Sequence, residues 1–160
     1  MIRAVFIIND AGQPRLVRWY ENVPEAERWG LMRRVFLSVS RRGDRLCNFL
    51  AVAWEGDAST SPSSSGSGES DRWIQGTRLV YRHYATLYFI FVCEETESEL
   101  GILDLIQVFV ETLDRCFDSV CELDLIFHAD KVHHVLDEII HCGLVLETNM
   151  MSVLRAVEDM

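Results

Sequence analysis

Short apolar runs and one longer amphipathic segment alternate along the first third of the chain. Residues 2–8 are apolar, rich in branched side chains and followed by an Asn-Asp-Ala-Gly turn signal, so they predict a strand. Residues 14–20 predict a second strand, which pairs with the first as an antiparallel hairpin. After Pro24 the apolar spacing predicts an amphipathic helix of about four turns. Its apolar positions are Ala26, Trp29, Met32, Val35, Phe36 and Val39.

Three more predicted strands precede a C-terminal half that is mostly helical. The predicted elements are strands at 46–54, 77–81 and 86–93, then helices at 101–117, 123–142 and 149–157. Thr96 and Glu99 have the spacing of a capping box before the long helix, and Gly143 is a stop signal for the next one. This order predicts an α+β fold, with a five-stranded, mainly antiparallel sheet and helices on both faces.

The length of the chain suits one domain. A chain of 160 residues is long enough to bury a substantial core, and we expect a single domain over residues 1–160. Residues 56–70 are rich in Ser and Gly and hold no large apolar side chain. Such a segment buries too little surface to offset its ordering entropy. We therefore expect a flexible loop between two strands there, and not a domain boundary.

Charge is spread unevenly along the chain, whose formal net charge is −10. Residues 1–45 hold nine Arg against five acids, whereas residues 94–160 hold three basic residues against sixteen acids. The acidic half disfavours binding to nucleic acid or anionic lipid. No apolar run reaches the roughly 20 residues of a membrane-spanning helix, so membrane contact is expected to come through partners. Arg15 follows a turn and is placed either to protect a sheet edge or to hold an incoming carboxylate.

Cysteines and histidines do not form a catalytic or metal-binding pattern. The five cysteines are Cys47, Cys93, Cys116, Cys121 and Cys142, an odd number that favours buried, reduced thiols in the cytosol. The spacing of His128, His133, His134 and His141 is not that of an HExxH zinc site, and it favours a solvated helix surface. We predict no catalytic residue, no cofactor and no metal. A hydrolase with a Cys–His pair is a distant alternative.

Several blocks of sequence occur in an order known from one family. They are MIRAVFIIND-AGQPRLVRWY at 1–20, CNFL at 47–50, YRHYATLYF at 81–89, ESELGILDLIQVFVETLD at 97–114, VCELDLIFH at 120–128 and GLVLETN at 143–149. Together these blocks resemble the sigma, or small, subunits of the heterotetrameric clathrin-type adaptor complexes. The blocks at 81–89 and 97–114 are most similar to the small subunit of adaptor protein complex three. The segment at 56–70 is longer than family members usually carry.

The resemblance implies a longin-like (SNARE-like) fold and a role without catalysis. It implies a core subunit of a vesicle-coat adaptor, assembled with delta-type and beta-type large subunits and a mu medium subunit. Such complexes are cytoplasmic and lie peripherally on Golgi, endosome and coated-vesicle membranes. They sort cargo from endosomes or the trans-Golgi toward lysosomes or vacuoles. The alternative is a longin-fold regulatory or tethering module that binds a GTPase or a fusion protein and no cargo peptide.

The resemblance also implies a site for acidic dileucine signals of the form [DE]xxxL[LI]. Carried over by position, the pocket falls on Tyr84, Ala85, Leu87, Val110, Ser119, Val120 and Leu125. Arg15 matches the position that contacts the acidic residue of the signal. Ser119 stands where the family usually has Asn, so a polar contact to the peptide is weaker here. Without the resemblance, the apolar members of this set indicate ordinary core packing.

Overall fold

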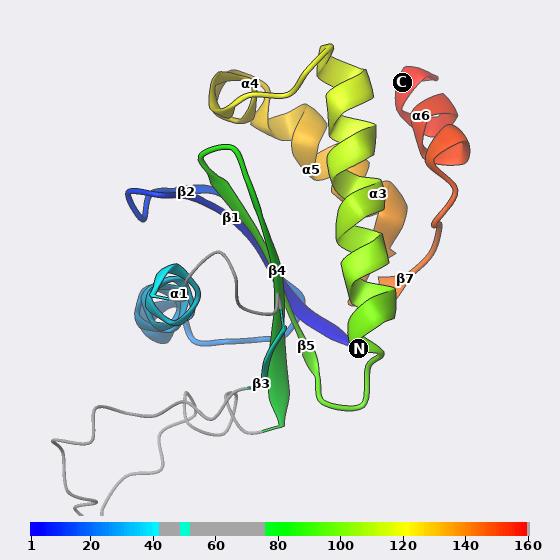
Figure 1. Ribbon diagram of the computed structural model, residues 1–160. Coiled ribbons are helices and arrows are strands. Elements are labelled where there is room, and N and C mark those ends of the chain that lie inside the picture. The colour runs from blue at the N-terminus through cyan, green and yellow to red at the C-terminus, as the bar shows by residue number, and fades with distance from the viewer. Residues whose placement is uncertain (42–48, 52–75, 160) are drawn as a thin grey trace, which may run out of the picture.

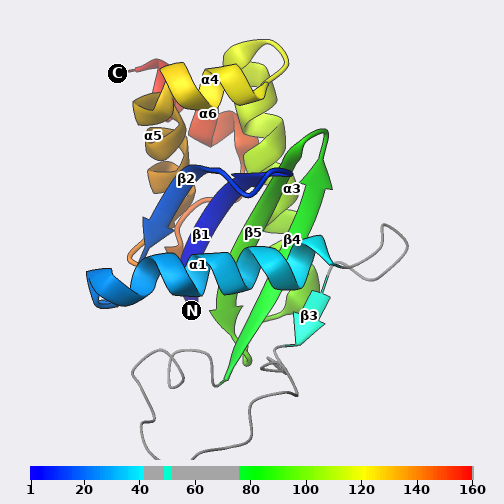
Figure 2. The ribbon, with the colours of Figure 1, turned by 90° about the vertical axis from the view of Figure 1, so that its left-hand side faces the viewer.

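A five-stranded antiparallel sheet forms the centre of the molecule. The computed structural model describes residues 1–41, 49–51 and 76–159, so the predicted loop at 56–70 lies outside the described residues. The strands are β1 (Ile2–Asn9), β2 (Pro14–Trp19), β3 (Phe49–Ala51), β4 (Thr77–Tyr84) and β5 (Leu87–Glu94). Their order in the sheet is β2-β1-β5-β4-β3, and each neighbouring pair is antiparallel (Figure 2). The predicted sheet is confirmed.

Helices cover both faces of the sheet, as the order of elements predicted (Figure 1). Among the described residues, one face is covered by α1 (Glu25–Ser40). The opposite face carries α3 (Glu99–Phe117) and α5 (Ala129–Ile139), with α6 (Met150–Glu158) packed against both of them. The short helix α4 (Glu122–Phe127) lies at one end of the sheet and contacts β2 and α5.

Strand β1 has both faces buried because it lies between β2 and β5 under the two helix layers. Side chains alternate along a strand, so Phe6 and Ile8 face α1 while Val5 and Ile7 face the other helices. These four residues are each 1% exposed or less. This double burial explains why residues 2–8 are a continuous apolar run without a polar face.

Two details of the predicted helices are wrong near their N-terminal ends. In α1, Trp29 is 59% exposed and Ala26 is also exposed, whereas Leu31 belongs to the buried face. With 3.6 residues per helical turn, Ala26 and Trp29 lie beside the row of α1 residues that faces the sheet. At α3 the cap is Ser98, whose Oγ accepts from the Gly101 amide at 3.2 Å, in place of the predicted Thr96–Glu99 box.

The predicted helix at 123–142 is two helices followed by a strand. His128 has φ −124° and ψ 39°, which is not helical, and it separates α4 from α5. The chain then forms β6 (Ile140–His141), which pairs with β7 (Leu144–Val145). Gly143 lies in the turn between them, with φ +80°, and a Cβ on it would clash with the Ile2 carbonyl oxygen. Gly143 therefore ends no helix; it permits close contact with β1.

Candidate functional site

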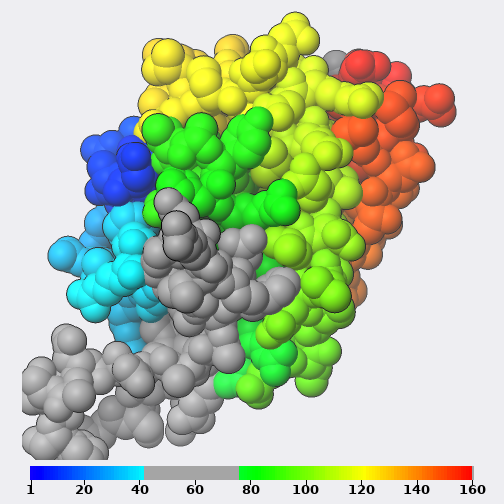
Figure 3. All heavy atoms as spheres, in the orientation of Figure 1, coloured from blue at the N-terminus to red at the C-terminus, as the bar shows by residue number. Residues whose placement is uncertain are grey.

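Four apolar side chains of the predicted dileucine pocket meet at one end of the molecule. Leu87 starts β5, Val110 lies on α3 and Leu125 lies on α4; they are 3%, 3% and 1% exposed and share one core cluster. Val120, in the turn between α3 and α4, is half-buried and packs against the same cluster. Figure 3 shows atoms of the β4–β5 turn (green) beside those of the α3–α4 region (yellow). Residues far apart in sequence are thus brought together.

Tyr84 and Ala85 lie at the exposed rim of this cluster. Tyr84 ends β4 and is 43% exposed, and its hydroxyl donates to Asp114 Oδ2 at 3.2 Å. Ala85 is in the two-residue turn before β5 and has φ +54°, a conformation that costs a non-glycine residue about 1–2 kcal/mol. Both residues therefore present polar or backbone groups at the surface, and neither adds to the apolar centre.

Asp114 organises this end of α3, although the sequence analysis did not single it out. Its Oδ1 accepts from the Val120 amide at 3.0 Å, its Oδ2 accepts from Tyr84, and its carbonyl accepts from the Ser119 amide at 2.9 Å. The negative charge of Asp114, and then its hydrogen bond, raises the pKa of the Tyr84 hydroxyl. An acid in the last turn of a helix opposes the helix dipole, so such a residue needs partners of this kind. An acidic residue in the last turn of a predicted helix is therefore a sign, visible in the sequence, that its carboxylate has hydrogen-bond donors nearby.

The turn that follows α3 holds two consecutive residues in the left-handed region. Asp118 has φ +49° and Ser119 has φ +81°, and both side chains are exposed. Asn tolerates this conformation better than Ser does, because its side chain can bond locally to the backbone. Ser119 therefore leaves this turn more strained than an Asn would.

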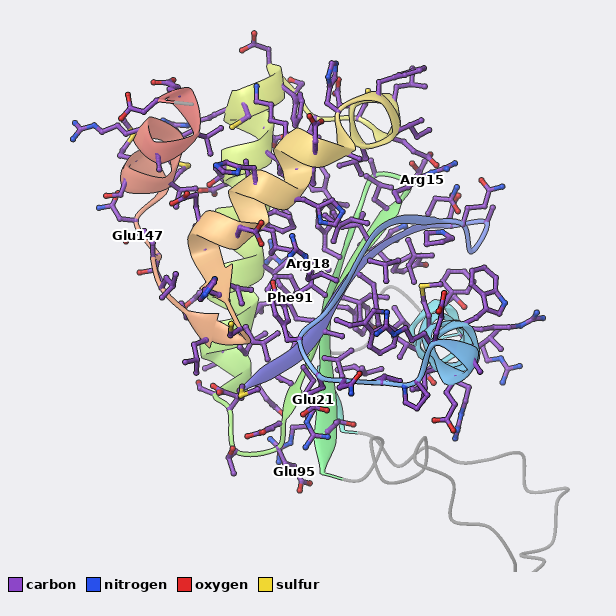
Figure 4. All side chains as sticks on the ribbon, turned by 180° about the vertical axis from the view of Figure 1, so that it is seen from behind. Arg15, Arg18, Glu21, Phe91, Glu95 and Glu147 are labelled. Atoms are coloured by element: carbon purple, nitrogen blue, oxygen red, sulfur yellow. The ribbon has the colours of Figure 1, made fainter. Side chains whose placement is uncertain are left out.

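Arg15 already holds a carboxylate of its own chain. Its Nε donates to Glu122 Oε1 at 2.7 Å, and its Nη2 donates to Gln13 Oε1 at 2.9 Å. The Arg15 and Glu122 side chains are 23% and 27% exposed. The hydrogen bond from Arg15, and next the one from Asn9, lowers the pKa of Glu122. Figure 4 shows Arg15 on β2 beside α4, so it lies close to the helix that carries Leu125.

The cysteines differ from the buried thiols that the sequence predicted. Cys93 is buried, and burial raises its pKa to about 11. Cys116 is partly buried, but Cys121 and Cys142 are exposed, so the prediction is wrong for these two. Cys121 is exposed because it precedes α4, where its Sγ donates to Asp124 Oδ2 at 3.4 Å. Cys47 lies outside the described residues.

Histidines of α5 contact charged neighbours. His133 Nδ1 lies 3.2 Å from Arg18 Nη2, and His134 Nε2 lies 3.7 Å from a Glu138 oxygen. Within residues 1–41, 49–51 and 76–159, no group of three or more His, Cys, Asp or Glu side chains is arranged to hold a metal ion. In the same described ranges, no helix combines the length and the apolar character needed to cross a membrane.

Comparison with known proteins gives matches over nearly the whole chain. Residues 1–160 match the family model of the clathrin adaptor complex small chain. AP-3 complex subunit sigma-2 of Homo sapiens is 52% identical over 158 residues, which are 99% of this chain and 74% of that protein. AP-3 complex subunit sigma of Dictyostelium discoideum is 50% identical over 149 residues, 93% of this chain and 79% of that one. The Schizosaccharomyces pombe subunit of the same description is 46% identical over 159 residues, covering 99% and 86%.

A structural comparison points to the same group. The fold is similar to a chain in a homology model of the full-length AP-3 complex in a stretched open conformation. The TM-score is 0.69 at 40% sequence identity, and the match covers 99% of this chain and 92% of that one. Sequence blocks, sheet order and these matches agree, and the chain belongs to the clathrin adaptor complex small chain family.

Proposed function

We propose that this chain is a non-enzymatic core subunit of a heterotetrameric adaptor and that it binds acidic dileucine signals, [DE]xxxL[LI]. Family membership makes it a subunit of a vesicle adaptor complex in protein transport. The proposed partners are delta-type and beta-type large subunits and a mu medium subunit. The proposed route runs from endosomes or the trans-Golgi to lysosomes or vacuoles, with the complex lying peripherally on the cytoplasmic side of those membranes.

One observation carries the proposal for cargo binding. Leu87, Val110 and Leu125 come from a strand and two helices and meet in one cluster, while Arg15 lies next to the helix that carries Leu125. A dileucine signal offers two apolar anchors and one negative charge. An apolar cluster with an arginine at its edge is complementary to that combination.

Burial means that this site must open before a leucine side chain can enter. Leu87, Val110 and Leu125 are at most 3% exposed. The chain's own Val120 packs against the core cluster that contains them, from the turn at 118–121. That turn holds two left-handed residues, which store strain of about 1–3 kcal/mol each. We propose that outward movement of this turn, with Val120, admits the peptide.

Val120 is therefore the most informative position for a test. An Asp at Val110 or Leu125 would bury an unpaired charge in the core and endanger folding. Val120→Asp instead places the charge at a half-buried position on the pocket. We expect it to weaken the binding of a fluorescein-labelled Glu-Ala-Ala-Ala-Leu-Leu peptide at least tenfold, because the charge opposes burial of a leucine. The assay is fluorescence anisotropy on the co-expressed heterotetramer.

A matched variant separates the pocket from a general effect of charge. Val145→Asp introduces the same group at an exposed valine of β7, outside the cluster. It should leave peptide affinity unchanged, and gel filtration should show intact tetramer for both variants. Unchanged affinity in Val120→Asp would remove this pocket from the proposal.

The competing role, a longin-fold module that binds a GTPase or fusion protein, predicts different partners. We would purify the tagged chain from its own cells and identify what accompanies it by mass spectrometry. The adaptor role predicts delta-, beta- and mu-type subunits in comparable amounts. A GTPase or fusion protein without those subunits would support the competing role, and the cluster would then be ordinary core.

A further inference from the structure

We propose that Asn9 and Arg15 form a preformed carboxylate site and that Glu122 is its resident carboxylate, which competes with the acidic residue of the signal. This inference rests on the proposed function, because the competitor matters only if a dileucine peptide binds. Glu122 then sets how much the signal's acid adds to affinity. It is a specificity-determining residue on α4 that the family pattern of the pocket did not include.

Two donors converge on a single oxygen of Glu122. Arg15 Nε lies 2.7 Å from Oε1, and Asn9 Nδ2 lies 2.8 Å from the same atom. Asn9 is only 6% exposed, so its amide is fixed in place. Its own Oδ1 accepts from the amides of Ala11 and Gln13 at 3.1 and 2.8 Å, which holds the turn between β1 and β2. The Nδ2 donor is thereby aimed outward, toward α4.

The contacts of Arg15 leave its best carboxylate-binding edge occupied. Nε and Nη2 form one edge of the guanidinium, and this edge can grip a carboxylate through two parallel hydrogen bonds. Here Nε is taken by Glu122 and Nη2 by Gln13. An incoming acid can use this edge only by displacing Glu122. Exchange of one carboxylate for another yields little net energy, so the acid of the signal contributes less than a free arginine would allow.

The groups in this contact lie on different elements. Asn9 is on β1 and pairs with Leu87 of β5, and Arg15 is on β2 at the register shift between Pro14 and Leu16. Glu122 is the first residue of a six-residue helix, directly after the strained turn at 118–121. The donors thus belong to strands of the sheet, and the carboxylate is on the element that moves if the pocket opens. This arrangement suits exchange of the carboxylate and retention of the donors.

The test compares two peptides on the intact heterotetramer. Glu-Ala-Ala-Ala-Leu-Leu carries the acid, and Gln-Ala-Ala-Ala-Leu-Leu lacks its charge. Glu122→Gln should tighten binding of the acidic peptide by about twofold to fivefold, the range that one partly exposed ion pair supplies. Affinity for the neutral peptide should not change. The preference for the acidic peptide therefore widens by the same factor.

Two further variants identify the cause. Asp130→Asn removes a negative charge from an exposed position on α5, and it should change neither affinity. In the background of Arg15→Ser, Glu122→Gln should give no gain, because there is no arginine to release. Such a cycle isolates the coupling between the two side chains.

Several results would overturn the competition. They are an unchanged affinity for the acidic peptide, an equal gain for both peptides, or a gain that persists without Arg15. Each of these leaves dileucine binding itself in place. If the unaltered complex binds neither peptide, the proposed function fails, and the competition fails with it.

Discussion

The two faces of the sheet are covered unequally. Among the described residues, the cluster under α3, α5 and α6 holds 23 buried side chains, and the cluster under α1 holds twelve. On the first face, α6 adds an outer layer over α3 and α5. In the described part of the chain, the second face is covered by α1, whose Trp29 is 59% exposed. Most of the apolar burial of the described residues is therefore on the α3 face.

Strained backbone occurs in three turns of the described chain. Ala85, Asp118, Ser119 and Cys142 have positive φ; the first three lie in the β4–β5 turn and the turn after α3, and Cys142 lies between β6 and β7. Strain of this kind persists only where the surrounding packing is extensive. Hollows occur on both sides: one of about 240 Å³ lies between α1 and the turn after β1, and one of about 570 Å³ lies between β2 and the end of α5. We call the face under α3, α5 and α6 the thick face and the face under α1 the thin face.

The largest expected effect is a difference between two buried leucines. Leu113 on α3 and Leu31 on α1 are 0% and 1% exposed. Leu→Ala in a core costs about 2–5 kcal/mol, and the cost is highest where neighbours cannot relax into the cavity. We expect about 4 kcal/mol for Leu113→Ala, which is enclosed by two layers, and about 2–3 kcal/mol for Leu31→Ala. Hydrogen exchange of each helix in the assembled complex, followed by mass spectrometry, gives these opening free energies.

Equal losses at the two leucines would show that the faces are equally rigid. The comparison of coverage would then say nothing about stability. A larger loss of opening free energy in Leu31→Ala than in Leu113→Ala would show that the α1 face is the better packed of the two.

Much of the fold follows from local patterns, because its elements are long and their periods are clear. The run at residues 2–8 predicted a strand, which the structure confirms as β1, and Val132, Val135 and Ile139 marked the inner face of α5. The N-cap of α3 was predicted wrongly because two neighbouring residues suit a cap equally well. Thr96 and Ser98 both suit a cap, and the choice is made by tertiary contact: Glu99 pairs with Arg78 of β4 at 2.9 Å and does not reach back to Thr96.

The site was only partly predictable for a similar reason. Its apolar members were predicted by resemblance, and the structure places Leu87, Val110 and Leu125 in one core cluster. The contact of Arg15 with Glu122 joins residues 107 apart, and no local pattern relates them. The burial of Leu125 likewise depends on the break at His128, which lets α4 turn away from α5. The apolar periodicity continues across His128, so the sequence pattern could not reveal the break.

A smaller effect is expected at the strained turn on the thick face. Ser119 has φ +81°, and a left-handed residue with a Cβ costs about 1–2 kcal/mol relative to its ordinary conformation. Ser119→Gly removes that cost but makes the unfolded chain more flexible, which offsets part of the gain. We expect a net stabilisation of about 0.5–1 kcal/mol, measured as slower exchange of the amides at 118–121.

Ser152→Gly is the matched change in ordinary backbone. Ser152 is exposed on α6, where glycine costs helix stability of roughly 0.5 kcal/mol. The same substitution should therefore have opposite signs at the two sites. If Ser119→Gly also destabilises, the turn is not strained, and its proposed readiness to move loses its physical basis.

The smallest effect concerns the contact between α5 and β2, at the edge of the face that α3, α5 and α6 cover. Burial, and next the charge of Arg18, lowers the pKa of His133 below its usual 6.5. The folded chain therefore binds this proton less readily than the unfolded chain does. Stability from this residue is complete above about pH 6.5, falls as the pH drops below that value, and stops falling below the folded-state pKa.

Hydrogen exchange of α5 at pH 7.5 and pH 5.5, corrected for intrinsic rates, measures this difference. Opening of α5 should be easier at pH 5.5, whereas α1, which does not carry His133, should show no such change. His133→Gln should remove the pH dependence from α5, since glutamine does not titrate. If α5 opens more easily at pH 5.5 to the same extent in the unaltered chain and in His133→Gln, other groups cause the pH dependence. His133 would then not weaken the contact between α5 and β2 at low pH.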